Sequence, residues 1–115
     1  MKLISTFLFA SLMTATALAE LEDGVLEKGF YNTNNPAICQ VNVLGFDSTS
    51  KELVTEAVGP NCRDRGLIFR YQKTPNESVW KGTKEARALT IVVASSRSFF
   101  LRGNGSNEAY FQKGD

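Results

Sequence analysis

The side chains that could do chemistry in this chain are its carboxylates and its two cysteines, because the chain contains no histidine. Histidine is the commonest general base and the commonest metal ligand, and without it neither a Ser-His-Asp nor a Cys-His nucleophile can be built. Glu20, Glu22, Asp23 and Glu27 lie close together in the sequence, and paired carboxylates can hydrolyse glycosides. A solvated polar segment is the better interpretation of these four residues. We therefore expect a binding protein rather than an enzyme, with no cofactor and no metal of its own.

The two cysteines, Cys39 and Cys62, are an even number in a small chain. If the protein is exported to an oxidising compartment, a structural disulfide is a better interpretation than a metal site or a reactive thiol pair. Closing this loop is worth about 3.5 kcal/mol in the chain-entropy treatment.

The first 19 residues have the pattern of a secretory signal peptide. Lys2 is followed by an apolar run at 3–13, and Ala17-Leu18-Ala19 places small residues where a signal peptidase cleaves. The run is too short to span a membrane, which takes roughly 20 apolar residues. We expect cleavage between Ala19 and Glu20 and a periplasmic or secreted protein.

The expected mature chain, residues 20–115, has the size of a single domain. It carries twelve basic and twelve acidic residues and has no run of lysines or arginines. Its charge therefore implies neither nucleic acid nor a membrane surface as a partner, and we expect a monomer.

Three smaller motifs have ordinary interpretations. The segment 103–107 resembles a phosphate loop but lacks the Gly-Lys-Ser/Thr ending, so a hairpin loop is expected. Trp80, the only tryptophan, is expected in the core. Asn76 and Asn104 begin glycosylation sequons, which matter only in a eukaryotic source.

Short runs of β-branched and aromatic residues, separated by turn residues, follow one another along the chain. They predict strands at 29–33, 39–43, 53–58, 67–71, 78–80, 88–93, 99–101 and 109–111, with a helical turn possible at 81–88. Seven or eight short strands indicate an all-β fold, either an antiparallel barrel or a sandwich. Alternation along these runs predicts a core that includes Val41, Val43, Leu67, Phe69, Ile91, Val93 and Phe100.

The stretch Pro36-Ala37-Ile38-Cys39-Gln40-Val41-Asn42-Val43 resembles the periplasmic inhibitors of serralysin-type metalloproteases. In that family a second cysteine follows at a spacing similar to that of Cys62, and then a tryptophan that Trp80 matches. Two apolar strands come next. A final strand is similar to 110–115, including its Gln-Lys-Gly-Asp. The resemblance covers most of residues 24–115.

This resemblance implies a lipocalin-like barrel of eight strands and a secreted protease as the partner. The family's inhibitory segment precedes the barrel and enters the protease cleft, where the terminal amine and the first carbonyl reach the catalytic zinc. By position this role falls to Glu20, Leu21, Glu22, Asp23 and Gly24.

Two other classes of binding protein stay open. A small secreted effector of a plant-associated fungus, with a two-cysteine β-sandwich, shares the signal peptide, the size and the single disulfide. A periplasmic lysozyme inhibitor is the other alternative, because Ala94-Ser95-Ser96 and the segment 111–115 resemble that family's Ser and Lys-Gly-Asp motifs.

Overall fold

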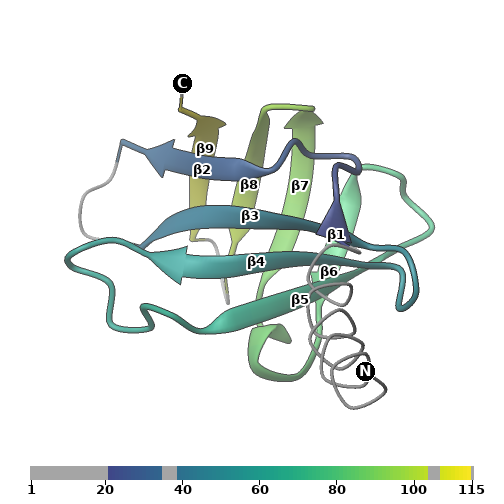
Figure 1. Ribbon diagram of the computed structural model, residues 1–115, viewed down its shortest axis with the longest axis horizontal. Helices are drawn as coiled ribbons and strands as arrows, with labels where there is room; N and C mark the ends of the chain where they lie inside the picture. The colour runs from purple at the N-terminus through teal and green to yellow at the C-terminus, as the bar shows by residue number, and fades with distance from the viewer. Residues whose placement is uncertain (1–20, 35–38, 104–106, 115) are drawn as a thin grey trace, which may run out of the picture.

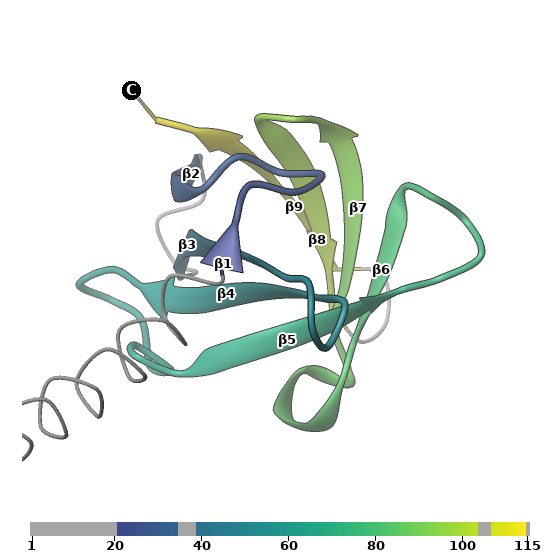
Figure 2. The ribbon, with the colours of Figure 1, turned by 45° about the vertical axis from the view of Figure 1, so that its right-hand side comes forward.

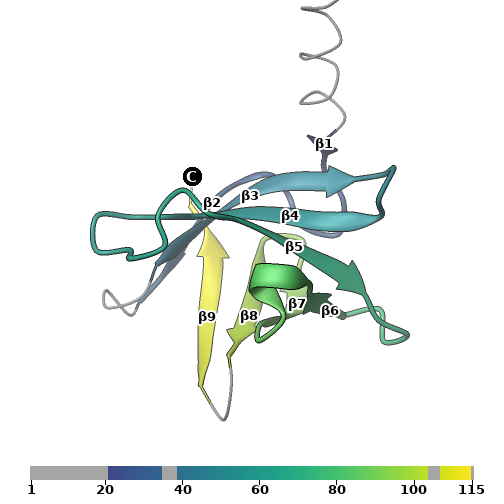
Figure 3. The ribbon, with the colours of Figure 1, turned by 90° about the horizontal axis from the view of Figure 1, so that it is seen from below.

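The protein is an all-β barrel with one short turn of 3-10 helix. The computed structural model describes residues 21–34, 39–103 and 107–114. Within these ranges the strands are β1 (Leu21–Glu22), β2 (Gly29–Thr33), β3 (Gln40–Asp47), β4 (Glu52–Val58), β5 (Ile68–Lys73), β6 (Val79–Gly82), β7 (Thr90–Ser95), β8 (Ser98–Arg102) and β9 (Glu108–Lys113), with the helical turn η1 (Lys84–Ala86) between β6 and β7 (Figures 1 and 3). Among the described residues, no helix has the length and apolar composition needed to cross a membrane.

Eight strands, β2 to β9, close into one antiparallel barrel. Neighbours along the chain pair from β2 through β3 to β9, and β9 then pairs back with β2. The two halves of the barrel cross steeply, so that β3, β4 and β5 run across β7, β8 and β9 (Figures 1 and 2). The barrel alternative is therefore correct and the sandwich is not.

The predicted strands are all present, and one further strand precedes them. β1 pairs with β3 through Leu21↔Asp47 and Glu22↔Phe46, on the same edge of β3 that β2 occupies farther along. The sequence analysis missed β1 because two residues are too short to show a strand period. The helical turn expected within 81–88 is η1.

The inside of the barrel is packed with large rings at one end. Tyr31 and Phe111 lie on either side of Phe99, whose ring stacks on that of Phe111 at 5.0 Å between centroids. Trp80, 4% exposed, meets the edge of Phe46, so the prediction that it belongs to the core is confirmed. Aromatic pairs of this kind add to the stability that burial itself gives.

Five of the seven predicted core residues face inward. Val41, Val43 and Ile91 are buried, and Phe69 and Val93 pack against the core. The predictions for Leu67 and Phe100 are wrong. Leu67 is 47% exposed because it precedes β5, past the rim of the barrel wall.

Phe100 faces outward because the register of β8 directs Phe99 and Leu101 inward. On the outer surface the Phe100 ring packs against that of Tyr110, with centroids 5.0 Å apart. The register lines these two residues up with Val92 and Val79 in one row across four strands. Two adjacent phenylalanines leave the sequence with no signal for which of them points inward.

Candidate functional site

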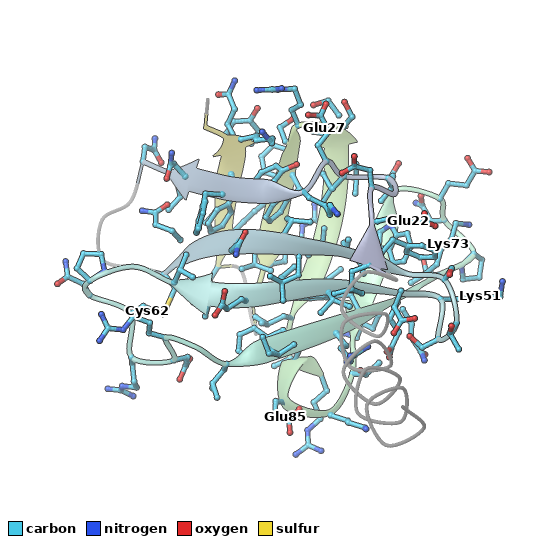
Figure 4. The ribbon with its side chains drawn as sticks, in the orientation of Figure 1. Glu22, Glu27, Lys51, Cys62, Lys73 and Glu85 are labelled. Carbon is cyan, nitrogen blue, oxygen red and sulfur yellow. A yellow bond between two sulfur atoms is a disulfide. The ribbon has the colours of Figure 1, made fainter. Side chains whose placement is uncertain are left out.

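The two ends of the barrel differ, and each carries features that bear on function. The predicted inhibitory segment lies at one end, where Glu22 is found, and the disulfide at Cys62 lies at the other (Figure 4). We call the first the closed end and the second the open end. The closed end is described first.

Most of the predicted inhibitory segment is attached to the barrel. Leu21 and Glu22 form β1, and Asp23 and Gly24 follow as exposed residues. Glu20, together with the expected cleavage site at Ala19, lies outside the described residues. The described residues 21–24 are thus a short edge strand and a turn, and not the unpaired segment that the sequence analysis expected ahead of the first strand.

A six-residue loop, 23–28, connects β1 to β2 and covers the closed end. The carboxylate of Asp23 accepts a hydrogen bond from the backbone N–H of Lys28 at 2.8 Å, and the Lys28 ammonium donates to the carbonyl of Leu21 at 3.1 Å. Leu26, at the centre of the loop, is fully buried in the core. The side chain of Leu26 therefore anchors the loop to the barrel.

The same loop is tied to the turn between β7 and β8. The backbone N–H of Glu27 donates to the carbonyl of Ser96 at 2.9 Å, and the Glu27 carboxylate pairs with Arg97 at 3.2 Å. The Tyr31 hydroxyl lies 2.8 Å from the carbonyl oxygen of Glu27. Burial, reinforced by the nearby Glu27 carboxylate, raises the pKa of Tyr31 to about 12, so this hydroxyl stays neutral as a donor.

Two of the four carboxylates singled out in the sequence have structural partners, Glu22 is exposed, and Glu20 lies outside the described residues. Asp23 accepts from Lys28 and Glu27 pairs with Arg97. In the described part of the chain, no group of three or more acidic or cysteine side chains could hold a metal ion.

The two motifs that resemble those of lysozyme inhibitors lie side by side at this end. Ser98 of β8 stands opposite Gln112 of β9, and the backbone N–H of Lys113 donates to the carbonyl of Arg97 at 2.8 Å. Ser95, the last residue of β7, shares a hydrogen bond of 2.6 Å with Ser98. Asp115 lies outside the described residues.

At the open end, Cys39 and Cys62 form the predicted disulfide, with their Cα atoms 4.6 Å apart. Cys39 directly precedes β3, and Cys62 lies in the loop that follows β4. The bond therefore ties the start of one barrel strand to the chain leaving its neighbour.

A cavity of about 520 Å³ opens beside the disulfide. Its apolar walls come from inward-facing residues of several strands: Val41, Ala57, Phe69, Leu101, Ala109 and Phe111. Small side chains leave the space, because Ala57 and Ala109 hold the inward positions of β4 and β9 at this end, and the larger Leu53 and Phe111 lie farther along the same strands. The sequence analysis missed this cavity, although an alanine at an inward strand position was a signal for it.

Two hydroxyls and one carboxylate add polarity to the cavity. Thr55 and Tyr71 line it and are almost fully buried, 1% and 2% exposed. Burial raises the pKa of the Tyr71 hydroxyl, while a hydrogen bond with Thr55 opposes that shift. Asp64 also lines the cavity. Glu56 and Glu108 contribute to the wall, but they alternate with the inward-facing residues of β4 and β9, and their carboxylates contact Asn42 and Arg102.

Of the two asparagines that begin sequons, only Asn76 is among the described residues. Asn76 lies in the turn before β6, where its side-chain oxygen accepts a hydrogen bond from the backbone N–H of Ser78 at 3.0 Å. Asn104 lies outside the described residues. The expected hairpin loop at 103–107 connects the paired strands β8 and β9. At its base the backbone N–H of Gly103 donates to the carbonyl of Asn107 at 3.0 Å.

Comparisons with known proteins identify no relative of this chain, so its function is argued from the geometry of the two barrel ends. No protein-family model, curated protein or solved structure matches this chain.

Proposed function

We propose that the mature protein inhibits a secreted zinc metalloprotease through the segment Glu20–Gly24, without catalysing a reaction. The observation that supports this proposal is the position of β1. This strand begins at Leu21, one residue after the expected mature N-terminus, and pairs with β3 of the closed barrel. We expect this pairing to limit the directions in which the terminal amine can extend from β1.

A terminal amine held in this way suits a catalytic zinc ion. Zinc accepts nitrogen ligands, and a catalytic zinc keeps one coordination position open for water or substrate. Glu22, Asp23 and Gly24 are exposed and are available for contact with the walls of a cleft. Because β1 and the loop 23–28 are already ordered, binding loses less conformational entropy than a free peptide would.

An inhibition assay against a serralysin-type protease from the same source tests the proposal. We expect residues 20–115 to inhibit, residues 25–115 to lose inhibition, and a chain with one residue added before Glu20 to bind far more weakly. One residue added after Asp115 is the control and should change nothing. An unaffected protease, or equal inhibition by residues 25–115, would overturn the proposal.

Gly45 allows the role of β1 itself to be tested. A Cβ atom at Gly45 would lie 2.9 Å from the carbonyl oxygen of Glu22, so Gly45→Ala pushes β1 away from β3. Gly59 has a similar positive φ, +117° against +138°, but a Cβ there meets only atoms at 3.6 Å or more. Gly59→Ala is therefore the matched control for backbone strain.

If β1 directs the amine, Gly45→Ala weakens inhibition more than Gly59→Ala does, at equal folded fraction by circular dichroism. Equal inhibition by the two variants would show that β1 need not stay paired with β3. The segment would then act as a detached peptide.

Inhibition of lysozyme is the second candidate, and it is favoured by the contact between the Ser95–Ser98 turn and Lys113. Lysozyme works through two carboxyl groups in its cleft. A lysine ammonium at this end of the barrel is a chemically complementary group, and the Lys113 ammonium lies close to Gly29 of β2. This candidate predicts that Lys113→Met abolishes inhibition of peptidoglycan hydrolysis. Lys73→Met, at the exposed last residue of β5, should leave that inhibition unchanged. If lysozyme stays fully active in the presence of the unaltered protein, this candidate fails.

A further inference from the structure

We propose that the cavity at the open end binds a compact, uncharged carbonyl compound, with an apolar body and one accepting oxygen that reaches the cavity floor. The cavity lies at the end of the barrel away from β1 and the loop 23–28, so this inference does not rest on the proposed protease inhibition. The cavity volume of about 520 Å³ falls within the range of roughly 300–1,000 Å³ that is typical of small-molecule sites.

The inward positions of β4 show how the cavity runs from floor to mouth. Leu53, Thr55 and Ala57 are buried at every second position of this strand. Leu53 belongs to the packed core, whereas Thr55 and Ala57 line the cavity. The strand runs toward the disulfide, because the loop that holds Cys62 follows it. Thr55 therefore lies at the floor of the cavity, and Ala57 lies nearer the mouth.

The walls between floor and mouth require a ligand with an apolar body. Val41, Phe69, Leu89 and Leu101 line the cavity together with Phe111, whose ring is stacked on that of Phe99. Large apolar cavities bind apolar molecules rather than ordered water. A ring or short chain that enters is removed from water, and this removal favours binding.

The floor carries a hydrogen-bond donor that the protein does not use. Thr55 and Tyr71, on the adjacent strands β4 and β5, are 1% and 2% exposed, and their side chains hydrogen-bond to each other. Two hydroxyls hold two O–H hydrogens, and their mutual bond uses one of them. Within the described part of the chain, neither side chain has a further hydrogen-bond partner.

The unused O–H hydrogen determines which polar group the ligand carries. A ligand without an acceptor would seal this donor away from water unpaired, which weakens binding. A ketone or ester oxygen accepts the hydrogen bond and brings no hydrogen of its own that would need a buried partner. The floor therefore favours a carbonyl oxygen at the inner end of the ligand.

The cavity gives a charged ligand no partner in its interior. The Glu56 and Glu108 carboxylates contact Asn42 and Arg102 on the outer side of the wall. Asp64, in the loop after β4, is the remaining charged residue of the described lining, and it is exposed at the mouth. Burying an ion without a partner is costly, so the ligand is expected to be neutral.

Two probes with the same two-ring body, 1-tetralone and tetralin, differ in one carbonyl oxygen. Each is titrated into residues 20–115 at pH 7 by isothermal titration calorimetry, below its solubility limit. The measured quantity is the ratio of their dissociation constants within one protein, because the difference in hydration between the probes is the same for every variant. Replacing both hydroxyls with groups of similar shape, in Thr55→Val with Tyr71→Phe, should weaken tetralone relative to tetralin by about tenfold, since one buried hydrogen bond is lost.

Control variants and a charged probe locate the site and test its chemistry. Tyr31→Phe removes a buried tyrosine hydroxyl that does not line the cavity, so the ratio should stay unchanged. Ala109→Phe fills the cavity and should abolish binding of both probes, and Ala57→Leu provides the same test if Ala109→Phe does not fold. Tyr110→Ser, on the outer surface beside Ala109, should bind both probes as the unaltered protein does. The carboxylate 1-naphthoate should bind more weakly than tetralone.

Four results would overturn the inference. They are no binding of either probe, an unchanged ratio in the double hydroxyl variant, 1-naphthoate binding at least as tightly as tetralone, and binding that persists in a folded Ala109→Phe or Ala57→Leu variant. The last result would place the probes outside the cavity. None of these outcomes bears on protease inhibition, which depends on the other end of the barrel.

Discussion

The hydroxyl of Tyr31 in β2 lies 3.2 Å from the carbonyl oxygen of Ser96 in the β7–β8 turn, 65 residues farther along the chain. The same hydroxyl lies 2.8 Å from the carbonyl of Glu27. One side chain thus links a barrel strand, the loop that covers the closed end, and the turn on the opposite wall.

Replacing Tyr31 with phenylalanine removes this link and leaves the packing of its ring against Phe99. We expect Tyr31→Phe to lower the free energy of unfolding by about 1 kcal/mol, because the single O–H donor shared between the Glu27 and Ser96 carbonyls is lost. Urea denaturation followed by circular dichroism measures the change. Tyr110→Phe, at a residue that is 42% exposed, is the control and should shift stability by less than about 0.5 kcal/mol.

Stability should fall in alkaline solution. Burial, reinforced by the Glu27 carboxylate, raises the pKa of Tyr31 from 10.0 to about 12, and burial also raises that of Tyr71. The unfolded chain therefore loses these protons at lower pH than the folded protein does. Stability is complete below pH 10 and declines as the pH rises from about 10 to 12. Unfolding measured from pH 8 to pH 11 should show the decline, and Tyr31→Phe should make it shallower. A flat profile would contradict this.

Leu26 and Val25 are neighbours with opposite environments and form a matched pair. Leu26 is fully buried and belongs to the core, whereas Val25 is 36% exposed. Leu26→Ala should cost about 2–5 kcal/mol through lost burial and the space left behind. Val25→Ala should cost less than about 1 kcal/mol. Similar effects of the two substitutions on thermal unfolding would mean that the loop 23–28 is not anchored as described.

Gly82, at the end of β6, has no room for a side chain. A Cβ atom there would lie 1.9 Å from the carbonyl oxygen of Ala86 in η1, and both elements would have to move apart. We expect Gly82→Ala to destabilise the protein by about 3 kcal/mol or more. Gly103→Ala meets only a Leu89 methyl carbon at 4.0 Å, so its denaturation midpoint should stay close to that of the unaltered protein.

The disulfide should stabilise the fold without being needed for its architecture. It closes a loop between residues 23 apart in the sequence. In the chain-entropy treatment, replacing both cysteines with alanine costs about 3.5 kcal/mol. The double variant should keep the β-type circular dichroism spectrum with a lower urea midpoint. Unchanged stability would mean that the bond constrains the unfolded chain less than this treatment assumes.

The sequence by itself determined the fold class, the positions of the eight barrel strands along the chain and the disulfide. Strand periodicity is local, so runs such as 53–58 and 99–101 carry it without help from the rest of the chain. Cys39 and Cys62, as the only two cysteines, leave a single possible intramolecular pairing. Trp80 is large and apolar enough for its burial to be expected from its type alone.

Tertiary structure alone decided which features share an end of the barrel. β1 is defined by two pairings with Asp47 and Phe46, more than 20 residues away, and two residues have no period of their own. Phe99 rather than Phe100 faces inward because the register with β7 and β9 sets the side of each residue. The cavity exists because Ala57 and Ala109, far apart in the chain, face the same interior, and only closure of the barrel brings their small side chains together.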